Sequence, residues 1–475
     1  MAVRIYNTLT GKEEEFKPQG EIVKMYTCGM TPKFHPHVGH ARLFVSIDVI
    51  RRYLIYRGYK IRFIQNFTDV DDKIIARSNK EGISAKDVAE KYTRSYFEVM
   101  DALGVLRADE YPKATNVISS IIRFIEKLIA DGYAYTLDGD VYFEVSKFPE
   151  YGKLSGRTEE EGVMAGARVE VEAGKRDPRD FALWKSAKPG EPAWESPWGP
   201  GRPGWHIECS TMIYETLGEQ IDIHAGGRDL IFPHHENEIA QSEAFCNCSP
   251  FVRYWVHIGL LNIGGEKMSH SLNNFLTIQQ LLERFEPAAI RLYLISIPYR
   301  APMAYSQEGV EAAAKGLARL RSALEIRKSA AEERPARPEE VEAVNRLVET
   351  AQKSFTEGMD SDFNTALALA ALYDLSREIN RLRVQERYPS EVLAPARGKL
   401  VELAGVLGLD LESQQQEEES RAADAYVDLL VEIRTKLRAA KQWALSDEIR
   451  DKLKSLGVIL EDTPDGTVWK YGEKS

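Results

Sequence analysis

The stretch CGMTPKFHPHVGHAR, residues 28–42, gathers one cysteine, three histidines and two glycines. Cysteine thiolates and imidazoles bind soft or borderline metal ions. Glycine and histidine at the start of a helix instead suit a phosphate group, because the first helical amides point at an anion and glycine lets the backbone approach it closely. His37 and His40 flank Gly39 and can donate hydrogen bonds to phosphate oxygens. The stretch predicts a metal ligand, a phosphate site or both, although a surface loop with chance histidines also fits the H-x-G-H pattern.

A second candidate phosphate site is the segment EKMSHS, residues 266–271. Lys267 is a long, flexible cation near two hydroxyl side chains, Ser269 and Ser271. Such a loop can close over a triphosphate and stabilise the charge that builds up on a leaving pyrophosphate. An ordinary exposed loop would have the same composition, so the segment is informative only together with residues 28–42.

The candidate metal ligands are Cys28, Cys209, His234 and Glu238. His234 and Glu238 lie four residues apart on a predicted helix and share one face of it, whereas His235 is expected to point off that face. Thiolate, imidazole and carboxylate groups together suit zinc. The two cysteines are too far apart in the sequence for spacing alone to pair them.

The remaining cysteines, Cys246 and Cys248, form a C-x-C pair about two helical turns beyond Glu238. A C-x-C pair can bind a metal ion, so it is a rival site. Ordinary buried or surface thiols are the alternative interpretation.

These residues need elements that position them. Residues 21–29 mix apolar and β-branched side chains and stop at a glycine, which predicts a strand. Residues 39–58 carry apolar residues at helical spacing and end at Gly58, and residues 59–69 are typical of the next strand. A strand, a helix and a strand of these lengths form a βαβ unit with a parallel sheet.

The second half of the predicted sheet lies beyond an insertion. Residues 110–200 alternate short helical and strand-like pieces and end in a Pro/Gly/Trp-rich stretch, 188–205. Residues 220–227 and 253–261 are predicted strands, and residues 233–245 between them a helix with proline in its first turn.

The composition changes at about residue 306. Ala/Leu-rich amphipathic patterns over 306–411 predict a helical bundle. The polar stretch 412–422 is interpreted as a linker. Residues 423–475 predict two helices followed by a hairpin with an Asp-Gly turn.

The chain has 475 residues, 43% hydrophobic and 28% charged, which is ordinary for a folded soluble protein of two to four domains. It has neither a long apolar run nor an apolar N-terminal signal core, so we expect a cytoplasmic protein with no membrane partner. Four cysteines in such a chain should be reduced or bound to metal. The net charge of −11 argues against non-specific DNA coating but leaves a local basic groove open.

The two phosphate elements together are more specific than either alone. H-x-G-H after the first strand and K-M-S-x-S after the last resemble the HIGH and KMSKS signatures of class I aminoacyl-tRNA synthetases. Further segments resemble the cysteinyl-tRNA synthetase family from the first strand to Trp469. These segments are TCGMT, HVGHARLFVSIDVIRRYL, NFTDVDDKII, GRPGWHIECS, DIHAGGRDLIFPHHENEIAQSEA and VILEDTPDGTVWK.

The resemblance implies an α/β fold: a Rossmann-like parallel-sheet catalytic domain with an insertion, an α-helical bundle and a small C-terminal α+β anticodon-binding unit. The expected boundaries are 1–305 for the catalytic domain (insertion about 110–200, KMSKS-type loop region about 250–305), 306–411 for the bundle, 412–422 for the linker and 423–475 for the anticodon-binding domain.

The resemblance also implies site residues. The expected catalytic residues are His37, His40 and Lys267. The expected ATP-binding residues are His37, Gly39, His40, Asp229, Lys267, Ser269 and His270. The expected zinc ligands are Cys28, Cys209, His234 and Glu238, at the floor of the amino-acid pocket. The expected cysteine-binding residues are Cys28, Gly29, Thr68, Trp205, His206 and His224. The expected anticodon-reading residues are Arg438, Asp447, Asp462 and Trp469.

The implied activity joins L-cysteine to its tRNA through a cysteinyl-adenylate, with ATP, Mg²⁺ and one Zn²⁺ per chain. Zinc binds a thiolate far better than a hydroxyl, so cysteine is told from serine by ligand chemistry and we expect no editing domain. A monomer is expected. The alternatives are a cysteine ligase that uses an amino sugar in thiol biosynthesis, whose family branch lacks the anticodon unit, and a non-catalytic tRNA-binding relic.

Two places depart from the family pattern. A Tyr-Asp-type sequence usually stands where this chain has PKFHPH, residues 32–37, so that Lys33, Phe34, His35 and Pro36 are unusual. The second lysine of KMSKS is His270, which is mostly neutral at pH 7 unless phosphate raises its pKa. We therefore hypothesise slower activation at high pH, with Lys267 carrying more of the phosphate binding.

Overall fold

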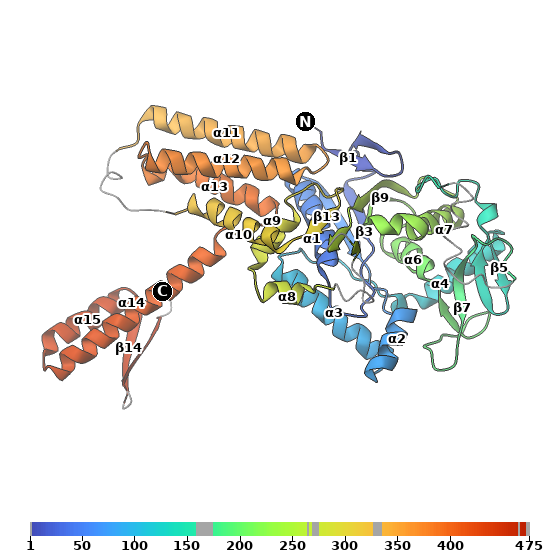
Figure 1. The fold of residues 1–475 in the computed structure, drawn as a ribbon, viewed down its shortest axis with the longest axis horizontal. Coiled ribbons are helices and arrows are strands. Elements are labelled where there is room, and N and C mark those ends of the chain that lie inside the picture. Colours follow the sequence, from blue (N-terminus) through green and yellow to red (C-terminus); the bar gives the residue numbers. More distant parts are fainter. Residues whose placement is uncertain are drawn as a thin grey trace. The chain divides into compact units, whose positions relative to one another are not determined.

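The computed structural model describes residues 2–157, 174–263, 266–267, 275–325, 335–463 and 466–471. The chain divides into two compact units, Met1–Leu409 and Asp410–Ser475. Figure 1 labels many of their helices and strands and colours the ribbon along the chain. No helix within the described ranges combines the length and the apolar character that a membrane span requires.

The first unit is built on a four-stranded parallel sheet in the order β10-β9-β3-β4. Its strands are β3 (Ile22–Thr27), β4 (Lys60–Gln65), β9 (Ile221–Gly227) and β10 (Val252–Ile258). Most of their side chains are buried, as expected for parallel strands covered on both faces. The predicted parallel βαβ unit is confirmed.

Helix α1 (Val38–Tyr56) connects β3 to β4 and is buried over most of its length. The imidazole of His37 accepts a hydrogen bond from the His40 amide, and His40 in turn accepts one from the His37 amide, so the two rings cap the helix N-terminus. Gly58 follows the helix at φ 88°, a left-handed conformation that glycine adopts without strain, and this ends the helix where predicted.

The region after β4 begins with helices α2 (Asp72–Glu81) and α3 (Ala85–Ala102). The predicted insertion, about 110–200, then contains α4 (Ile118–Ala130) and three strands of an antiparallel sheet in the order β5-β6-β7-β8, whose last strand follows directly after it. These strands are β5 (Ala134–Leu137), β6 (Asp140–Phe143), β7 (Phe181–Ser186) and β8 (Gly201–Pro203). The core of the insertion is continuous with two helices of the catalytic region, because Ile207 and Ala240 pack into it.

Those two helices are α6 (Trp205–Leu217) and α7 (Glu236–Cys246). The helix predicted over 233–245 begins three residues late. Ile231–His235 form a π-helical turn with Phe232 outside the helical region, so Pro233 belongs to this turn and α7 starts at Glu236.

The rest of the first unit consists of short strands and the predicted helices of the bundle. The bundle helices are α10 (Gln307–Ser322), α11 (Pro338–Asp360), α12 (Thr365–Val384) and α13 (Ser390–Val406). The remaining elements are β1 (Arg4–Asn7), β2 (Lys12–Glu15), β11 (Leu261–Ile263), β12 (Glu266–Lys267), β13 (Met303–Tyr305), α8 (Ile278–Leu282) and α9 (Pro287–Leu294).

The second unit contains α14 (Ser413–Ala439), α15 (Trp443–Ser455) and the antiparallel hairpin of β14 (Val458–Thr463) and β15 (Gly466–Tyr471). The two helices and the hairpin are as predicted, and Val427, Leu453 and Val458 form its buried core. The stretch 412–422, interpreted as a linker, instead forms the first turns of α14. Its Gln, Glu, Arg and Ala residues are good helix formers, so polarity alone does not make it irregular.

Candidate active site and metal centre

A cavity of about 480 Å³ lies at the carboxyl ends of β3, β9 and β10. Open parallel sheets bind their ligands at this edge. The cavity is lined by Cys28, Gly29, Met30, Thr31, Lys33, Phe34, His35, His37, Gly39, His40, Leu43, Lys73, Trp205, Gly227, Asp229, Leu230, Ile258, Gly259, Leu260, Leu261 and Phe275. Another cavity, of about 490 Å³, runs between Asp69 and Trp194, and its described lining includes none of the predicted site residues.

The four predicted metal ligands lie together. One ligand atom of each of Cys28, Cys209, His234 and Glu238 lies within 4.8 Å of the others, and all four residues are buried. The two sulfur atoms are 3.8 Å apart, and His234 Nε2 is 2.9 Å from Glu238 Oε1. We call these four residues the metal-ligand cluster.

Different elements bring the cluster together. Cys28 directly follows β3, Cys209 lies on α6, His234 in the π-helical turn and Glu238 in the first turn of α7. Asn66, just after β4, joins two of them: its Oδ1 accepts the Gly29 amide at 2.7 Å, and its Nδ2 lies 3.6 Å from Cys209 Sγ. Sequence reasoning missed Asn66, although it belongs to the same NFTD segment as Thr68.

A second group overlaps the first. Cys28, His224, His235 and Glu238 also place one ligand atom each within 4.8 Å of one another. The expectation that His235 points away is wrong, because its Nε2 lies 3.5 Å from Cys28 Sγ. That expectation assumed a regular helix through residue 233, and the π-helical turn changes the direction of the side chain. The second group offers one thiol group, whereas the metal-ligand cluster offers two.

The cluster is electrostatically coupled. Burial raises the pKa of the Cys28 thiol, whereas a hydrogen bond from Cys28 lowers the pKa of Cys209 to about 6. Burial alone would raise the pKa of Glu238, but the charges of His224 and His234 outweigh it and lower that pKa to about 2. Likewise, burial lowers the pKa of His234, but Glu238 and Cys209 raise it to about 10.

In the absence of a metal ion, these pKa shifts favour ionised Cys209 and Glu238 beside a protonated His234. With both thiols ionised and His234 neutral, two thiolates and one carboxylate would leave three negative charges in the interior. Buried charge of this size needs a compensating cation. The donor chemistry of the cluster therefore fits a divalent metal ion.

Aromatic rings border the cluster. Trp205 lines the cavity, is 39% exposed, and stacks on His234 with ring centroids 4.4 Å apart. His206 Nδ1 lies 2.9 Å from His234 Nδ1, and His224 Nε2 lies 2.9 Å from Glu238 Oε2. His206 and His224 therefore contact the candidate ligands His234 and Glu238. Neither histidine is part of the cavity lining, where a cysteine-binding residue was expected.

Thr68 is buried beside Glu208, where its hydroxyl opposes the burial that raises the pKa of that carboxyl. It does not line the cavity, so the expected direct contact of Thr68 with the amino acid has no support in this geometry. Gly29, in contrast, lies in the cavity wall beside Cys28.

The H-x-G-H residues lie on the same cavity. The rings of His37 and His40 stack with centroids 3.7 Å apart, and Gly39 lies between them in the sequence. Burial and the nearby charge of Lys33 lower the pKa of His40 to about 4. His40 is therefore neutral at pH 7. Asp229, one of the expected ATP-binding residues, also lines the cavity.

Two lysines that were not among the predicted site residues line the cavity as well. Lys33 and Lys73 form what we call the lysine pair. Burial and the charge of Lys73 lower the pKa of Lys33, with Asp71 opposing them. Among the described residues neither ammonium group has an ion pair, and Lys73 Nζ lies 6.0 Å from the Trp205 ring centroid. The sequence marked Lys33 as unusual for the family, because it lies in the PKFHPH segment, but did not predict that it lines the cavity.

Other predicted residues cannot be placed in the site. The side chains of Lys267, Ser269, His270 and Ser271 lie outside the described residues. In the second unit, Asp447 forms an ion pair with Arg450 at 3.2 Å. The Trp469 indole donates to Asp428 at 2.7 Å and packs on the small core.

Arg438 lies in the last turn of α14 and Asp462 on β14. The four predicted anticodon residues thus lie on different elements of the second unit.

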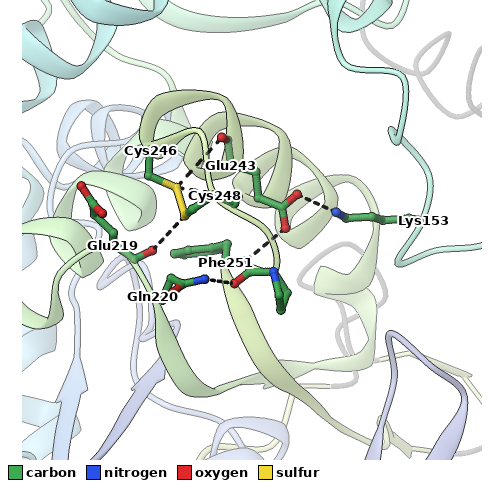
Figure 2. The surroundings of a disulfide bond; sticks show 8 residues. Lys153, Glu219, Gln220, Glu243, Cys246, Cys248 and Phe251 are labelled. Atoms are coloured by element: carbon green, nitrogen blue, oxygen red, sulfur yellow. Dashed lines mark hydrogen bonds and ion pairs between the residues drawn. A yellow bond between two sulfur atoms is a disulfide. The ribbon is translucent and has the colours of Figure 1, made fainter. Parts of the chain in front are cut away.

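The expectation that all cysteines are reduced or metal-bound is wrong for one pair. Cys246 and Cys248 form a disulfide, with their Cα atoms 5.2 Å apart (Figure 2). Asn247 between them has the left-handed conformation that ends α7, and this turn brings the two side chains together. The free cysteines of the chain are Cys28 and Cys209.

Comparison with known proteins agrees with this geometry. Residues 15–315 match the family model described as "tRNA synthetases class I (C) catalytic domain", and residues 354–412 match the DALR domain. Among solved structures, methionyl-tRNA synthetase of Mycobacterium tuberculosis in complex with methionyl-adenylate superposes with a TM-score of 0.62 at 17% identity. The superposition covers 87% of this chain and 94% of the methionyl-tRNA synthetase chain. The ternary LeuRS–tRNA–LeuAMS complex of Agrobacterium radiobacter K84 gives 0.57 at 13% identity, covering 84% and 86%. These likenesses show the class I fold.

Curated relatives are far more similar. The cysteine–tRNA ligase of Dehalococcoides mccartyi (strain 195) is 50% identical over 99% of this chain and 100% of that protein. The cysteine–tRNA ligase of Thermococcus gammatolerans is 51% identical over 99% of both chains. Since such identity extends along the entire chain, the chain belongs to the cysteine–tRNA ligase family of class I aminoacyl-tRNA synthetases.

Proposed function

We propose that this protein ligates L-cysteine to its cognate tRNA at the expense of ATP, through a cysteinyl-adenylate. The observation that carries the proposal is the meeting of two sites in one cavity: Cys28 of the metal-ligand cluster and the H-x-G-H residues line the same space. The carboxylate of a bound cysteine must meet the α-phosphate of ATP, so adjacent sites for sulfur and phosphate are what the reaction needs.

We assign the metal-ligand cluster to one Zn²⁺ ion, held by Cys28, Cys209, His234 and Glu238. Two thiolates, an imidazole and a carboxylate form a donor set typical of zinc. When bound, zinc would supply an ion that prefers a substrate thiolate to a serine hydroxyl. His206 and His224 orient His234 and Glu238 through their 2.9 Å contacts. An editing domain is then unnecessary.

The other end of the cavity handles the nucleotide. His37 and His40 donate hydrogen bonds toward phosphate oxygens as the cysteine carboxylate attacks the α-phosphate, and Asp229 binds the ribose. Lys33 and Lys73 add two positive charges from the lysine pair, and Lys267 is assigned the same role from its sequence signature. Mg²⁺ accompanies ATP. Positioning and charge stabilisation supply the catalysis, and no protein nucleophile is required.

The tRNA is the acceptor of the cysteinyl group, through the 2′ hydroxyl of its terminal ribose. We propose that the second unit, Asp410–Ser475, reads the anticodon by contacts to base edges and by stacking. Arg438, Asp447, Asp462 and Trp469 remain the candidate residues. We further propose that the protein is a cytoplasmic monomer.

Two other functions have weaker support. An amino-sugar cysteine ligase would need no anticodon unit, yet the second unit is a folded α+β module. A non-catalytic relic would have lost the phosphate or metal residues, yet both sets line or adjoin one cavity.

One assay separates the three functions: cysteine-dependent ATP–pyrophosphate exchange, followed by charging of cysteine tRNA. The proposed function requires both. Exchange without charging would favour the amino-sugar ligase, and absence of exchange would favour the relic. Serine in place of cysteine is the matched control and should support no exchange.

A further inference from the structure

The disulfide between Cys246 and Cys248 takes no part in the site described above, and its place in the chain is unusual for a structural cross-link. It joins residues only two positions apart. A disulfide stabilises a fold mainly by closing a loop in the unfolded chain, and the gain grows with loop length. A loop this short gains less than a typical structural disulfide does, so stabilisation alone is a weak reason for the bond.

The turn around the disulfide is also held without it. Glu243 Oε1 accepts the Phe251 amide at 3.1 Å, and Glu243 Oε2 lies 2.6 Å from Lys153 Nζ. The Gln220 side chain donates to the Pro250 carbonyl at 2.8 Å. Figure 2 shows these contacts on both sides of the turn. These contacts hold the connection from α7 to β10 through groups other than the two sulfur atoms.

Each sulfur atom lies near a backbone carbonyl oxygen to which it could donate a weak hydrogen bond as a thiol. Cys246 Sγ lies 4.0 Å from the Glu243 carbonyl oxygen, and Cys248 Sγ lies 4.0 Å from the Glu219 carbonyl oxygen (Figure 2). A thiol is a weak donor, and sulfur forms hydrogen bonds at such longer distances. Both cysteines are partly exposed, whereas Cys28 and Cys209 are buried.

We propose that Cys246 and Cys248 form a thiol–disulfide exchange site for low-molecular-weight thiols. A small thiolate attacks Cys248 Sγ, whose surroundings are the more exposed, and forms a mixed disulfide. The Cys246–Cys248 bond breaks, and Cys246 leaves as a thiolate that takes up a proton. A second small thiolate then attacks the sulfur atom that the first small thiol contributed to the mixed disulfide. It releases the oxidised small disulfide and the Cys248 thiolate.

The net reaction moves two electrons from two small thiols to the protein disulfide, and the reverse reaction reoxidises the pair. L-cysteine belongs to this class of thiol and is the substrate under the proposed function. The exchange itself does not depend on that function, because any small thiol can carry it out. Because two thiols react for each disulfide released, the state of the pair follows the square of the cysteine concentration divided by the cystine concentration.

The test equilibrates the full-length wild-type protein with mixtures of cysteine and cystine, alkylates free thiols and maps them by mass spectrometry. Cys246 and Cys248 should become labelled together as the cysteine fraction rises, and dithiothreitol should have the same effect. A disulfide that resists both reductants in the folded protein would overturn the proposal. So would cystine-treated protein in which the two thiols remain free.

Single substitutions trap the intermediate. Cys246→Ser leaves Cys248 alone, and this variant should gain one cysteinyl adduct at Cys248 in cystine, whereas the matched variant Cys246→Ser/Cys248→Ser should gain none at this turn. Absence of the adduct on Cys248 would overturn the assigned order of attack. ATP–pyrophosphate exchange, measured on the same samples, reports on the proposed function separately.

Discussion

The metal-ligand cluster and the lysine pair border one cavity but are held in opposite ways. The cluster is buried, and its groups bond to one another and to His206, His224 and Asn66. Lys33 and Lys73 line the same cavity, and neither forms an ion pair with a described residue. Burial and the charge of Lys73 lower the pKa of Lys33. The difference indicates that the metal-ligand end of the cavity is organised in advance, whereas the lysine end keeps two cations available for an anionic ligand.

The most severe test breaks the cluster itself. Cys209→Ser exchanges a thiolate for a hydroxyl, a much weaker ligand for a soft ion. We expect zinc content to fall to near zero and cysteine-dependent ATP–pyrophosphate exchange to drop by more than about 100-fold, since even changes to residues around metal ligands cost 10–100-fold. Metal analysis of the purified variant provides the measurement. Full zinc occupancy with wild-type exchange would remove Cys209 from the site.

Removing the metal from wild-type protein tests the zinc assignment without any substitution. A strong chelator should abolish exchange, and added Zn²⁺ should restore it, because the buried anions lose their compensating cation. The melting temperature should fall on chelation, since binding energy to the folded state is lost. Unchanged exchange and melting after verified metal removal would contradict the zinc assignment.

The lysine pair is tested by Lys33→Gln, which removes the charge and shortens the side chain by one atom. A charged hydrogen bond to phosphate contributes about 1.5–3 kcal/mol, so the KM for ATP should rise by about tenfold or more while that for cysteine changes little. Lys80→Gln, on the same domain but away from the cavity lining, is a matched control. Equal KM values for ATP in Lys33→Gln and wild type would exclude Lys33 from phosphate binding.

The same variant makes a pH prediction. The folded-state pKa of His40 is about 4, below its ordinary 6.5, and the charge of Lys33 contributes to that depression. His40 therefore stays neutral in wild type as the pH falls through 6.5. Without the cation its pKa should rise, so that protonation, seen by NMR of ¹³C-histidine protein, begins at higher pH. An unchanged pKa would show that burial alone sets it, and a pKa that falls would contradict the effect assigned to Lys33.

A smaller effect is expected from His270→Lys, which restores the usual signature. At high pH a neutral His270 carries no charge for phosphate, whereas lysine remains protonated. The exchange rate above about pH 7 should rise by roughly two- to fivefold, in the range of an exposed charge contact. Superimposable pH profiles for the variant and wild type would refute the hypothesis.

The smallest effect is expected at the second pair of cysteines. In Cys246→Ser/Cys248→Ser the loop-closure relation allows a loss of only about 1.6 kcal/mol in unfolding free energy. Zinc content and exchange activity should match wild type, because the disulfide lies outside the cavity lining. Denaturant unfolding and metal analysis check this. A loss of zinc would mean that the turn positions Glu238 after all.

The sequence by itself determined the elements whose patterns are local. The strand–helix–strand unit of β3, α1 and β4, the bundle helices and the terminal hairpin follow from periodicity, glycine stops and turn residues. The signature motifs also identified His37, Gly39 and His40 as residues of one site. The pairing of Cys28 with Cys209 came only from family resemblance, because 181 positions separate them.

Tertiary structure decided the rest. Asn66, Lys33 and Lys73 enter the site because strand ends and loops distant in sequence converge at one edge of the sheet. His235 joins the ligand surroundings because a π-helical turn replaces the regular helix that its spacing implied. The left-handed Asn247 turns Cys246 back to Cys248. Side-chain direction depends on backbone conformation and on packing across the fold, and neither is encoded by spacing along the chain.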